Sequence, residues 1–381
     1  MRLLHTSDWH LGRTFHREDL LSAQASFIDF LLDTVRAERI DAVVVAGDLY
    51  DRALPSVDAV AVCDDALRRL AAAAVPTVLI SGNHDSARRL GFGADLIDAA
   101  GVHLRTDPRR CGEPVVVEDD HGPVAIYGIP YLEPDAARSV LDCQDRTHDA
   151  VLSAAMGRIR ADLAHRRDSR SVVLAHAFVS GGSPSESERD ISVGGALSVP
   201  AGVFAGVDYV ALGHLHGAQR VAQSCHYSGS PLAYSFSEAT HTKSVTVVDL
   251  EPGSGVRVER IPCPVPRRLA RLRGRLEDLL GDATLESYED HYLSVTLTDP
   301  ARPQDPMQRL RRRFPHTLVL DLEPEGVQRD KRSYVERLRG LDDLAVATSF
   351  LADVRGRDAE ASERALLTAA LVAGARSEGD A

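Results

Sequence analysis

The stretch LISGNHDSARR, residues 79–89, joins an apolar, strand-like run to a glycine, an amide, an imidazole and a carboxylate at residues 82–85. The apolar run predicts a buried strand, and the polar residues after it predict a functional loop at the strand's carboxyl end. A strand that ends in this way is typical of an open α/β sheet. The prediction of the fold therefore depends on whether other strands of the chain end in residues of the same kind.

Four other β-rich runs end in residues of the same kind. They are LLHTSDWH with Asp8 and His10, VVVAGDLYD with Asp48, VVLAHAF with His176, and YVALGHLH with His214 and His216. The carboxyl ends of strands in an α/β sheet converge on one crevice. We therefore expect all of these side chains to meet in one site.

The residue types predict a site for two divalent cations. Carboxylates, imidazoles and one amide oxygen, with no thiolate, suit Mn²⁺, Mg²⁺ or Fe²⁺ and argue against a structural zinc site. Two neighbouring ions need a bridging carboxylate, and Asp48 is expected to supply it. The expected ligands form two sets: Asp8, His10, Asp48 and His216 for one ion, and Asp48, Asn83, His176 and His214 for the other.

His84 is not needed as a ligand, so it is predicted to be catalytic. It is expected to neutralise a phosphate oxygen or to protonate the leaving oxygen, with Asp85 holding its imidazole in place. Two bound ions activate a water for attack on phosphorus, and the site therefore predicts phosphoester hydrolysis. Taken singly, a strand-end Asp more often caps a turn and a lone buried His is more often a core residue. The ordered set of five motifs favours the catalytic interpretation.

The first two thirds of the chain alternate β-rich and helical runs, which predicts an α/β sheet with crossover helices. The β-rich runs from residue 115 onward have less helix between them, which predicts a second, partly antiparallel sheet packed on the first. Three prolines in residues 262–266 mark a domain boundary. The expected domains are 1–264, a small α/β domain at 265–330 that opens with a helical run, and a linker with two helices at 331–381.

Composition places the chain among globular proteins, with 44% hydrophobic and 26% charged residues. No apolar run approaches the ~18–20 residues that span a bilayer, and the start has no signal-peptide core, so we expect a cytoplasmic protein with no membrane contact. Five scattered cysteines without a C-x-x-C pair predict reduced thiols. The net charge of −12 argues mildly against general affinity for nucleic acid, so DNA contacts would need local basic clusters.

The motifs HTSDWHLGR, GDLYDRALPS, GNHDSARRL and YSGSPLAYSFSE resemble those of the calcineurin-like metallophosphoesterase family, and within it the bacterial nuclease subunits that act on DNA double-strand breaks. The resemblance is close for residues 1 to about 265 and looser beyond. It implies a two-sheet metallophosphoesterase sandwich flanked by helices, a small α/β capping domain and C-terminal partner-binding helices. One departure is Asp51, which stands where archaeal and eukaryotic relatives carry a histidine, and this leaves the role of Asp51 open.

The resemblance also implies an activity and partners. It implies Mn²⁺-dependent exonuclease activity on double-stranded DNA ends, endonuclease activity on hairpins and single strands, and dependence on an ATPase partner subunit. It further implies a homodimer, paired through helices near Leu90, Leu96 and Ile97. By spacing alone these three residues are ordinary core.

Arginines close to the motifs and in the second domain are candidates for contact with DNA phosphates. They are Arg13, Arg52, Arg88 and Arg89 beside the metal motifs, and Arg268 and Arg311 in two basic helical runs. The alternative is a solvated, salt-bridged surface, which the interleaved Glu277 and Asp278 favour.

Two apolar helical patterns at the chain's end predict a surface for the ATPase partner. The residues are Phe350, Leu351, Val354, Leu366, Leu367 and Leu371. The alternative is that these helices fold back on the catalytic domain. For the whole protein, the alternatives to a DNA nuclease are a hydrolase of a small phosphodiester or phosphoprotein and a non-catalytic DNA-end scaffold.

Overall fold

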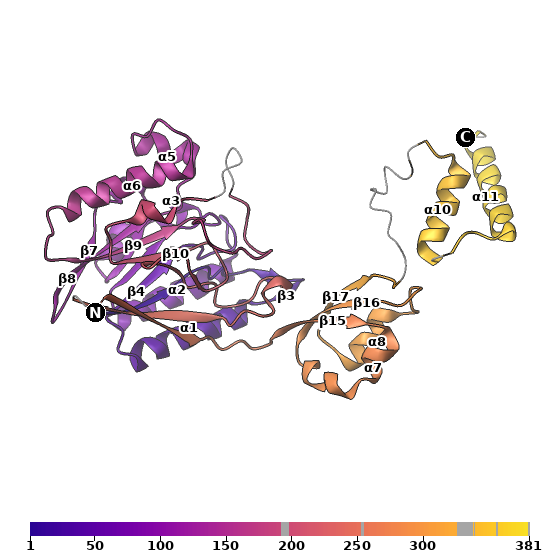
Figure 1. Ribbon diagram of the computed structural model, residues 1–381, viewed down its shortest axis with the longest axis horizontal. Coiled ribbons are helices and arrows are strands. Elements are labelled where there is room, and N and C mark those ends of the chain that lie inside the picture. The colour runs from indigo at the N-terminus through magenta and orange to yellow at the C-terminus, as the bar shows by residue number, and fades with distance from the viewer. Residues whose placement is uncertain (192–197, 253–254, 326–337, 339, 356, 380–381) are drawn as a thin grey trace. The chain divides into compact units, whose positions relative to one another are not determined.

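The computed structural model describes residues 1–191, 198–252, 255–325, 338, 340–355 and 357–379. These fall into two compact units, Met1–Pro266 and Arg267–Ala381 (Figure 1). The three-domain division expected from the sequence stays a prediction, and its second boundary, at residue 330, lies outside the described residues.

The first unit contains two six-stranded sheets. The first sheet has the order β14-β13-β1-β4-β5-β6, with β1 (Arg2–Thr6), β4 (Ala42–Ala46), β5 (Thr77–Ile80), β6 (Val102–Arg105), β13 (Ser244–Glu251) and β14 (Gly255–Pro262). The second has the order β11-β12-β10-β9-β8-β7, with β7 (Val115–Asp119), β8 (Gly122–Ile129), β9 (Arg170–His176), β10 (Tyr209–Gly213), β11 (Gln219–Arg220) and β12 (Cys225–Tyr227). Since β7 and β11 pair antiparallel and the rest of the second sheet is parallel, the predicted α/β fold with a partly antiparallel second sheet is confirmed. The assignment of the run at residues 243–251 to that second sheet is wrong, because it forms β13 and pairs antiparallel with β1 in the first sheet.

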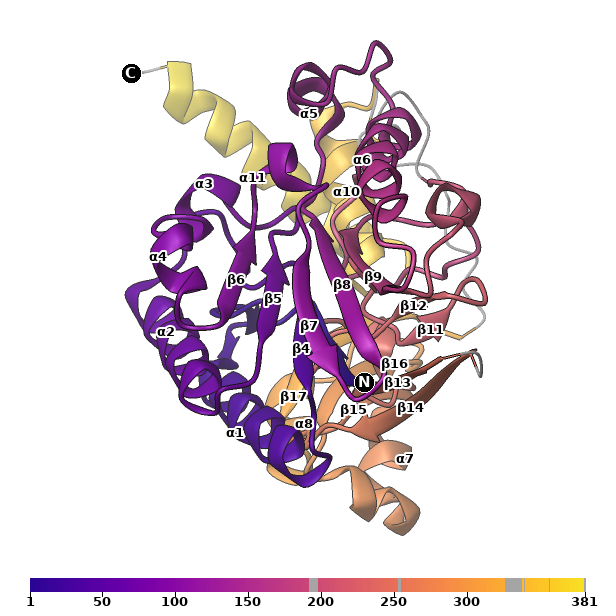
Figure 2. The ribbon, with the colours of Figure 1, turned by 90° about the vertical axis from the view of Figure 1, so that its left-hand side faces the viewer.

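Helices cover the outer faces of both sheets (Figure 2). They are α1 (Leu21–Ala37), α2 (Val57–Ala72), α3 (Ala87–Leu90), α4 (Ala94–Asp98), α5 (Pro134–Val140) and α6 (His148–Leu163), with the short 3₁₀ turns η1 (Pro108–Arg110), η2 (Ala201–Phe204) and η3 (Phe236–Glu238) and the small ribbon β2 (Thr14–Phe15) and β3 (Glu18–Asp19). Side-chain caps fix the starts of α2, α5 and α6, the cap of α5 being Glu133. Ser56 accepts the N–H of Ala59 at the start of α2, and Thr147 accepts the N–H of Ala150 at the start of α6.

The central strands are apolar on both faces because both faces are covered. On neighbouring strands β1 and β4, Leu3 and Val44 point into the layer between the two sheets. Leu4 and Val43 point the other way, toward α1 and α2. This alternation holds the two sheets face to face, so that strand ends from both lie at one edge.

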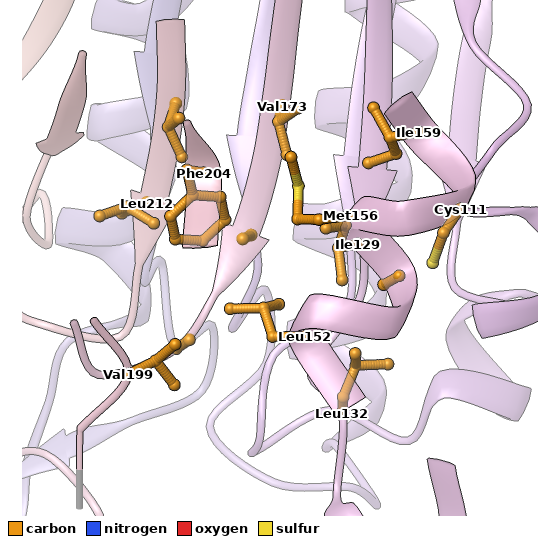
Figure 3. Close-up of a cluster of buried hydrophobic side chains, with 14 of the residues drawn as sticks. Cys111, Ile129, Leu132, Leu152, Met156, Ile159, Val173, Val199, Phe204 and Leu212 are labelled. Carbon is orange, nitrogen blue, oxygen red and sulfur yellow. The ribbon is translucent and has the colours of Figure 1, made fainter. Parts of the chain in front are cut away.

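A third apolar layer joins α6 to the outer face of the second sheet (Figure 3). Leu152, Met156 and Ile159 lie on one face of the helix and are fully or almost fully buried. They pack in a cluster with Val173 of β9 and Ile129 of β8. The strands that lead into the candidate site are therefore held rigidly from both sides.

The second unit begins with a three-stranded parallel sheet of order β15-β16-β17. Its elements are β15 (Leu269–Gly274), α7 (Leu276–Gly281), the 3₁₀ turn η4 (Ala283–Tyr288), β16 (Tyr292–Leu297), α8 (Pro306–Arg313) and β17 (Thr317–Leu322). The helix predicted at the start of this domain is wrong for residues 269–274. Ala270 and Leu272 are buried while Arg271 and Arg273 are exposed, which is the two-residue period of a strand.

Two helices, α10 (Asp343–Arg355) and α11 (Ala361–Gly379), contact each other near the C-terminus, and the two predicted helical segments are confirmed. Several of their apolar side chains face solvent, with Phe350 56%, Val354 53% and Leu366 72% exposed. Leu371 is also exposed, whereas Leu351 and Leu367 are half-buried. Among the helices that the structure describes, none is long and apolar enough to cross a membrane.

Candidate metal centre

Backbone hydrogen bonds bring the loops after β1 and β4 together. The N–H of Asp8 donates to the carbonyl of Gly47 at 3.0 Å, and the N–H of His10 donates to the carbonyl of Asp48 at 3.0 Å. The side chains of the first two motifs therefore come to lie side by side, as expected for neighbouring parallel strands.

Four of the predicted ligands have left-handed backbone conformations, which non-glycine residues rarely adopt. The φ angles are 54° at Asp8, 46° at His10, 50° at Asp48 and 107° at His214. Strained backbone of this kind persists where the surrounding structure holds it and is concentrated at functional sites. The sharp turns aim these side chains back across the strand ends.

Two glycines allow the loops to approach this closely. A Cβ atom on Gly82 would overlap the carboxylate of Asp48, and one on Gly213 would overlap the carbonyl of Ala46. Glycine is thus required here for lack of space, since neither residue has a positive φ.

The first expected set of ligands is assembled and buried. Donor atoms of Asp8, His10 and His216 lie within 4.8 Å of one another. The Nε2 atoms of His10 and His216 face each other at 3.1 Å. Asp48 joins the group, with its Oδ2 3.7 Å from Nε2 of His10.

The second set is assembled as well. Nε2 of His176 lies 2.8 Å from Oδ1 of Asn83 and 3.5 Å from Oδ2 of Asp48. Nδ1 of His214 lies 3.2 Å from the same Asn83 oxygen. Asp48 lies in one donor group with His10 and His84 and in another with Asp8 and His176, so its place fits that of a residue shared by two ions.

The hydrogen bonds of His176 indicate whether a cation would fit among the second set of residues. Its Nδ1 lies 2.9 Å from the carbonyl of Ala46, which can only accept, so Nδ1 carries a proton. In the neutral ring, Nε2 then presents a lone pair to the oxygens of Asn83 and Asp48. Lone pairs that converge in this way require a second proton or a cation between them. Nitrogen and oxygen donors without thiolate suit a divalent cation.

Burial and mutual repulsion shift the pKa values of these groups. Burial raises the pKa of Asp8 to about 6 although nearby imidazoles oppose the shift. Burial would also raise the pKa of Asp48, but His176 and other imidazoles hold it below its ordinary value. Burial lowers the pKa of His214 to about 3, whereas Asp48 overcomes burial at His176 and raises its pKa to about 9. The protons held in this cluster are those that a bound cation would displace.

His84 and Asp85 differ in what they contact. The N–H of His84 donates to Oδ1 of Asp48 at 2.8 Å, and its Nδ1 lies 2.7 Å from the carbonyl of Asp51. The prediction that Asp85 holds the His84 imidazole is wrong, because the carboxylate turns away from the ring. It accepts the backbone N–H groups of Gly82, Leu49 and Tyr50, and so ties the GNHD loop to the loop after β4.

The candidate arginines near the motifs fall into two kinds. Arg13 already has partners within the protein: its guanidinium lies 4.8 Å from the Tyr234 ring centroid and donates to the Ser187 carbonyl at 2.9 Å. Arg52 and Arg88 have exposed side chains, and Arg89 is exposed while bonded to the Ala53 carbonyl. In the second unit Arg268 is exposed, and Arg311 donates from Nε to the Thr317 carbonyl at 3.1 Å.

Arg189 belongs to none of the sequence motifs, and the role of Asp51 was left open. Exposed Arg189 lies with its Nη1 3.4 Å from the Asn83 carbonyl. Asp51 has its carboxylate 3.8 Å from Nδ1 of His10 and 3.7 Å from Nε of Arg13. Close to the expected dimer helices, Leu96 is 83% exposed while Ile97 packs on the core. The homodimer stays a prediction.

Comparison with known proteins gives matches along most of the chain. Residues 1–218 match the family described as calcineurin-like phosphoesterase, and residues 265–355 match the family described as type 5 capsule protein repressor C-terminal domain. The D subunit of the nuclease SbcCD from Staphylococcus saprophyticus is 29% identical over 359 residues, which cover 93% of this chain and 94% of that protein.

Two solved structures are also similar. TT1561 of Thermus thermophilus has a TM-score of 0.40 and 15% identity, over 68% of this chain and 98% of that one. A dimetal phosphatase from Danio rerio has a TM-score of 0.38 and 13% identity, over 69% of this chain and 99% of that one.

Proposed function

The chain belongs to the calcineurin-like phosphoesterase family and is a metal-dependent phosphodiester hydrolase, and from that premise we propose that it is a Mn²⁺-dependent DNA nuclease that acts with an SbcC ATPase subunit. In this proposal it degrades double-stranded DNA ends as an exonuclease and cuts hairpins and single strands as an endonuclease. Its place is in DNA end processing, recombination and repair.

One observation carries the proposal. The five predicted strand ends, three from one sheet and two from the other, bring all seven expected ligand residues into one largely buried group. When two divalent ions are bound there, they supply Lewis acidity and an activated water for attack on phosphorus. Mn²⁺ is the proposed ion, and Mg²⁺ or Fe²⁺ would suit the same donors.

The chain's own residues supply positioning and proton transfer. The backbone of Asp51 holds Nδ1 of the His84 ring, which leaves Nε2 to exchange a proton with the substrate. Asp48 fixes the His84 backbone, so that this ring stays beside the ligand group. Asp85 acts on the loop and not on the ring.

The proposed substrate is DNA because exposed arginines lie close to the ligand motifs in the sequence and another, Arg189, lies 3.4 Å from the Asn83 carbonyl. Arg52, Arg88, Arg89 and Arg189 follow or flank the ligand motifs and can neutralise backbone phosphates. The similarity to the SbcCD nuclease extends through the second unit, where Arg268 and Arg311 are the proposed phosphate contacts. The exposed apolar residues of α10 and α11 are the proposed contact for SbcC.

The first experiment measures Mn²⁺-dependent cleavage of end-labelled duplex and hairpin DNA, with and without SbcC. His84→Gln is expected to lower the cleavage rate by roughly 10²- to 10⁴-fold while Mn²⁺ still binds. His103→Gln is the matched control, since His103 bonds to Asp98 and contacts no ligand residue. If the DNA stayed intact with Mn²⁺ and SbcC present, the proposed nuclease activity would be refuted.

A second candidate is a hydrolase of small phosphodiesters. A pocket of about 690 Å³ lies beside the GNHD loop, lined by Gly82, Asp85, Arg88 and Tyr131 among others, and this volume suits a small molecule. Bis-p-nitrophenyl phosphate in the same assay separates the two candidates. Rapid turnover of this ester with no DNA cleavage would favour the second.

A further inference from the structure

Glu238 is a buried carboxylate that the ligand set does not use. It ends η3, is 1% exposed, and closes the segment YSGSPLAYSFSE, residues 227–238. A buried carboxylate is stable only when it is paired and hydrogen-bonded. Its Oε2 forms an ion pair with Lys243, and its Oε1 accepts the hydroxyl of Ser187 at 2.6 Å.

Ser187 links this carboxylate to a predicted metal ligand. Its Oγ lies 2.6 Å from Nδ1 of His216. The single hydroxyl proton is directed to the ionised Glu238, which can only accept, so Oγ must accept the proton of Nδ1. His216 is thereby held in the tautomer with a free lone pair at Nε2. That nitrogen is the one that faces His10.

The same group also holds the backbone of His216. The ammonium of Lys243 donates to the His216 carbonyl at 2.9 Å and to Oγ of Ser230 at 3.0 Å. The N–H of His216 donates to Glu188 at 2.8 Å. Neighbouring side chains therefore fix both the ring and the backbone of His216.

A second branch of the segment reaches Asp8. Oγ of Ser228 lies 3.0 Å from Oγ of Ser7, and Ser7 donates to the Asp8 carboxylate at 2.5 Å. Asp8 and His216 both belong to the set expected for the first ion. Asp8 is not confined to the first set, since its carboxylate also accepts the N–H of His214 at 3.0 Å and shares a donor group with His176. Only the branch through Ser187 is specific to the first set, because it ends on His216.

We propose that Glu238 and Ser187 are positioning residues that orient His216 for one of the two metal ions, the one also expected to be held by Asp8, His10 and Asp48. This inference rests on the proposed two-metal centre. Through Glu238, the segment 227–238 would thereby set the orientation of one ligand of that ion. Groups that orient ligands in this way typically strengthen metal binding by about 10- to 100-fold.

The test is titration of the metal-free full-length protein with Mn²⁺, with affinity and stoichiometry measured by calorimetry. Ser187→Ala is expected to weaken one of two sites by about 10- to 100-fold and to leave the other unchanged. Ser187→Thr, which keeps the hydroxyl, is expected to restore the affinity. Ser171→Ala is the matched control, because Ser171 also bonds to a carboxylate, that of Asp208, and contacts no ligand residue.

Removal of Glu238 alone would leave Lys243 buried and unpaired, and the protein could lose its fold for that reason. The variant Glu238→Gln/Lys243→Met removes both charges, and so tests the loss of the carboxylate without leaving an unpaired charge at Lys243. It too is expected to weaken one site selectively.

The inference would be overturned if Ser187→Ala bound Mn²⁺ at both sites as tightly as Ser171→Ala does. It would also be overturned if Ser187→Ala weakened both sites equally. Wild-type protein that binds two Mn²⁺ ions without cleaving DNA would count against the proposed nuclease only. Wild-type protein that binds no Mn²⁺ would overturn the metal centre and, with it, the inference.

Discussion

Oδ1 of Asp48 accepts the backbone N–H of His84 at 2.8 Å. The residue expected to join the two ions thus also fixes the loop that carries the expected proton donor. A change at Asp48 can therefore affect both metal binding and the placement of His84, and a test has to separate the two effects.

Asp48→Asn separates them, because the amide oxygen can still accept the His84 N–H while the negative charge is lost. We expect Mn²⁺ affinity to fall by more than the roughly 100-fold that groups behind the ligands contribute, and cleavage to be lost with it. The measurement is Mn²⁺ titration together with cleavage of labelled DNA. Unchanged affinity for both ions would contradict the assignment of Asp48 as a ligand.

Gly213→Ala should destabilise the protein, because the added methyl group would overlap the carbonyl of Ala46 on the facing sheet. Overpacking of this kind costs about 1–3 kcal/mol, which chemical denaturation would detect. Gly157→Ala is the control: it lies within α6 with no atom near the new Cβ, and it should stabilise by about 0.5–1 kcal/mol. Equal effects of the two changes would mean that the sheets can separate without cost.

His5 should make the fold sensitive to acid. It is fully buried between the hydroxyl of Tyr209 and the carbonyl of Leu212, and burial lowers its pKa from 6.5 to about 3. Between these two values the unfolded chain binds a proton at this residue and the native protein does not. Its contribution to the free energy of unfolding is therefore constant above pH 6.5 and falls by ~1.4 kcal/mol per pH unit toward pH 3.

Comparison with His5→Gln isolates this contribution, since the other buried histidines are present in both proteins. The stability difference between wild type and variant, measured by denaturant unfolding from pH 7 to 4, should narrow as the pH falls. A difference that does not change with pH would show that His5 takes up a proton in the native state.

The arginines of the second unit can be tested through salt dependence. Arg268→Glu/Arg311→Glu should weaken DNA binding and reduce the slope of log affinity against log salt by about 2, since each phosphate contact contributes about 0.9. Arg36→Glu, on the exposed face of α1, is the control and should leave the slope nearly unchanged. An unchanged slope in the double variant would mean that the two arginines are ordinary surface residues.

The exposed apolar side chains of α10 and α11 can be tested by charge. Phe350→Asp and Leu366→Asp should each abolish co-purification with SbcC while Mn²⁺ binding stays intact, because a charge cannot enter an apolar interface unpaired. Val57→Asp is the control, since Val57 is an even more exposed apolar residue of the first unit. Retained co-purification would place the SbcC contact elsewhere.

The meeting of the seven expected ligand residues could be predicted from the sequence because each lies at or just after the end of a strand, and strand ends converge by the geometry of the sheet. Neighbours in sequence proved a poorer guide, since Asp85 follows His84 and yet bonds the backbone of Leu49 and Tyr50. The strand β15 was predicted as a helix because its leucines and arginines fit either period over so few residues.

The network around Glu238 could not be predicted in the same way. It depends on the paths of two irregular loops, one with Ser187 and one with residues 227–238, and no periodicity describes such paths. The motif YSGSPLAYSFSE could be recognised in the sequence as similar to a family. The contacts that explain it form only where the two loops meet in the folded protein. Arg189 was missed for a similar reason, because it lies in an irregular loop and in none of the motifs.

The left-handed conformations at Asp8, His10, Asp48 and His214 also bear on how this protein can evolve. Each costs about 1–3 kcal/mol, and glycine would relieve that cost at every one of the four positions. Folding therefore favours the loss of these residues, and hydrolysis is the selective reason to keep them. A descendant released from that selection is expected to lose these four predicted ligand residues before its sheets, and to remain as a more stable protein of the same fold without the activity.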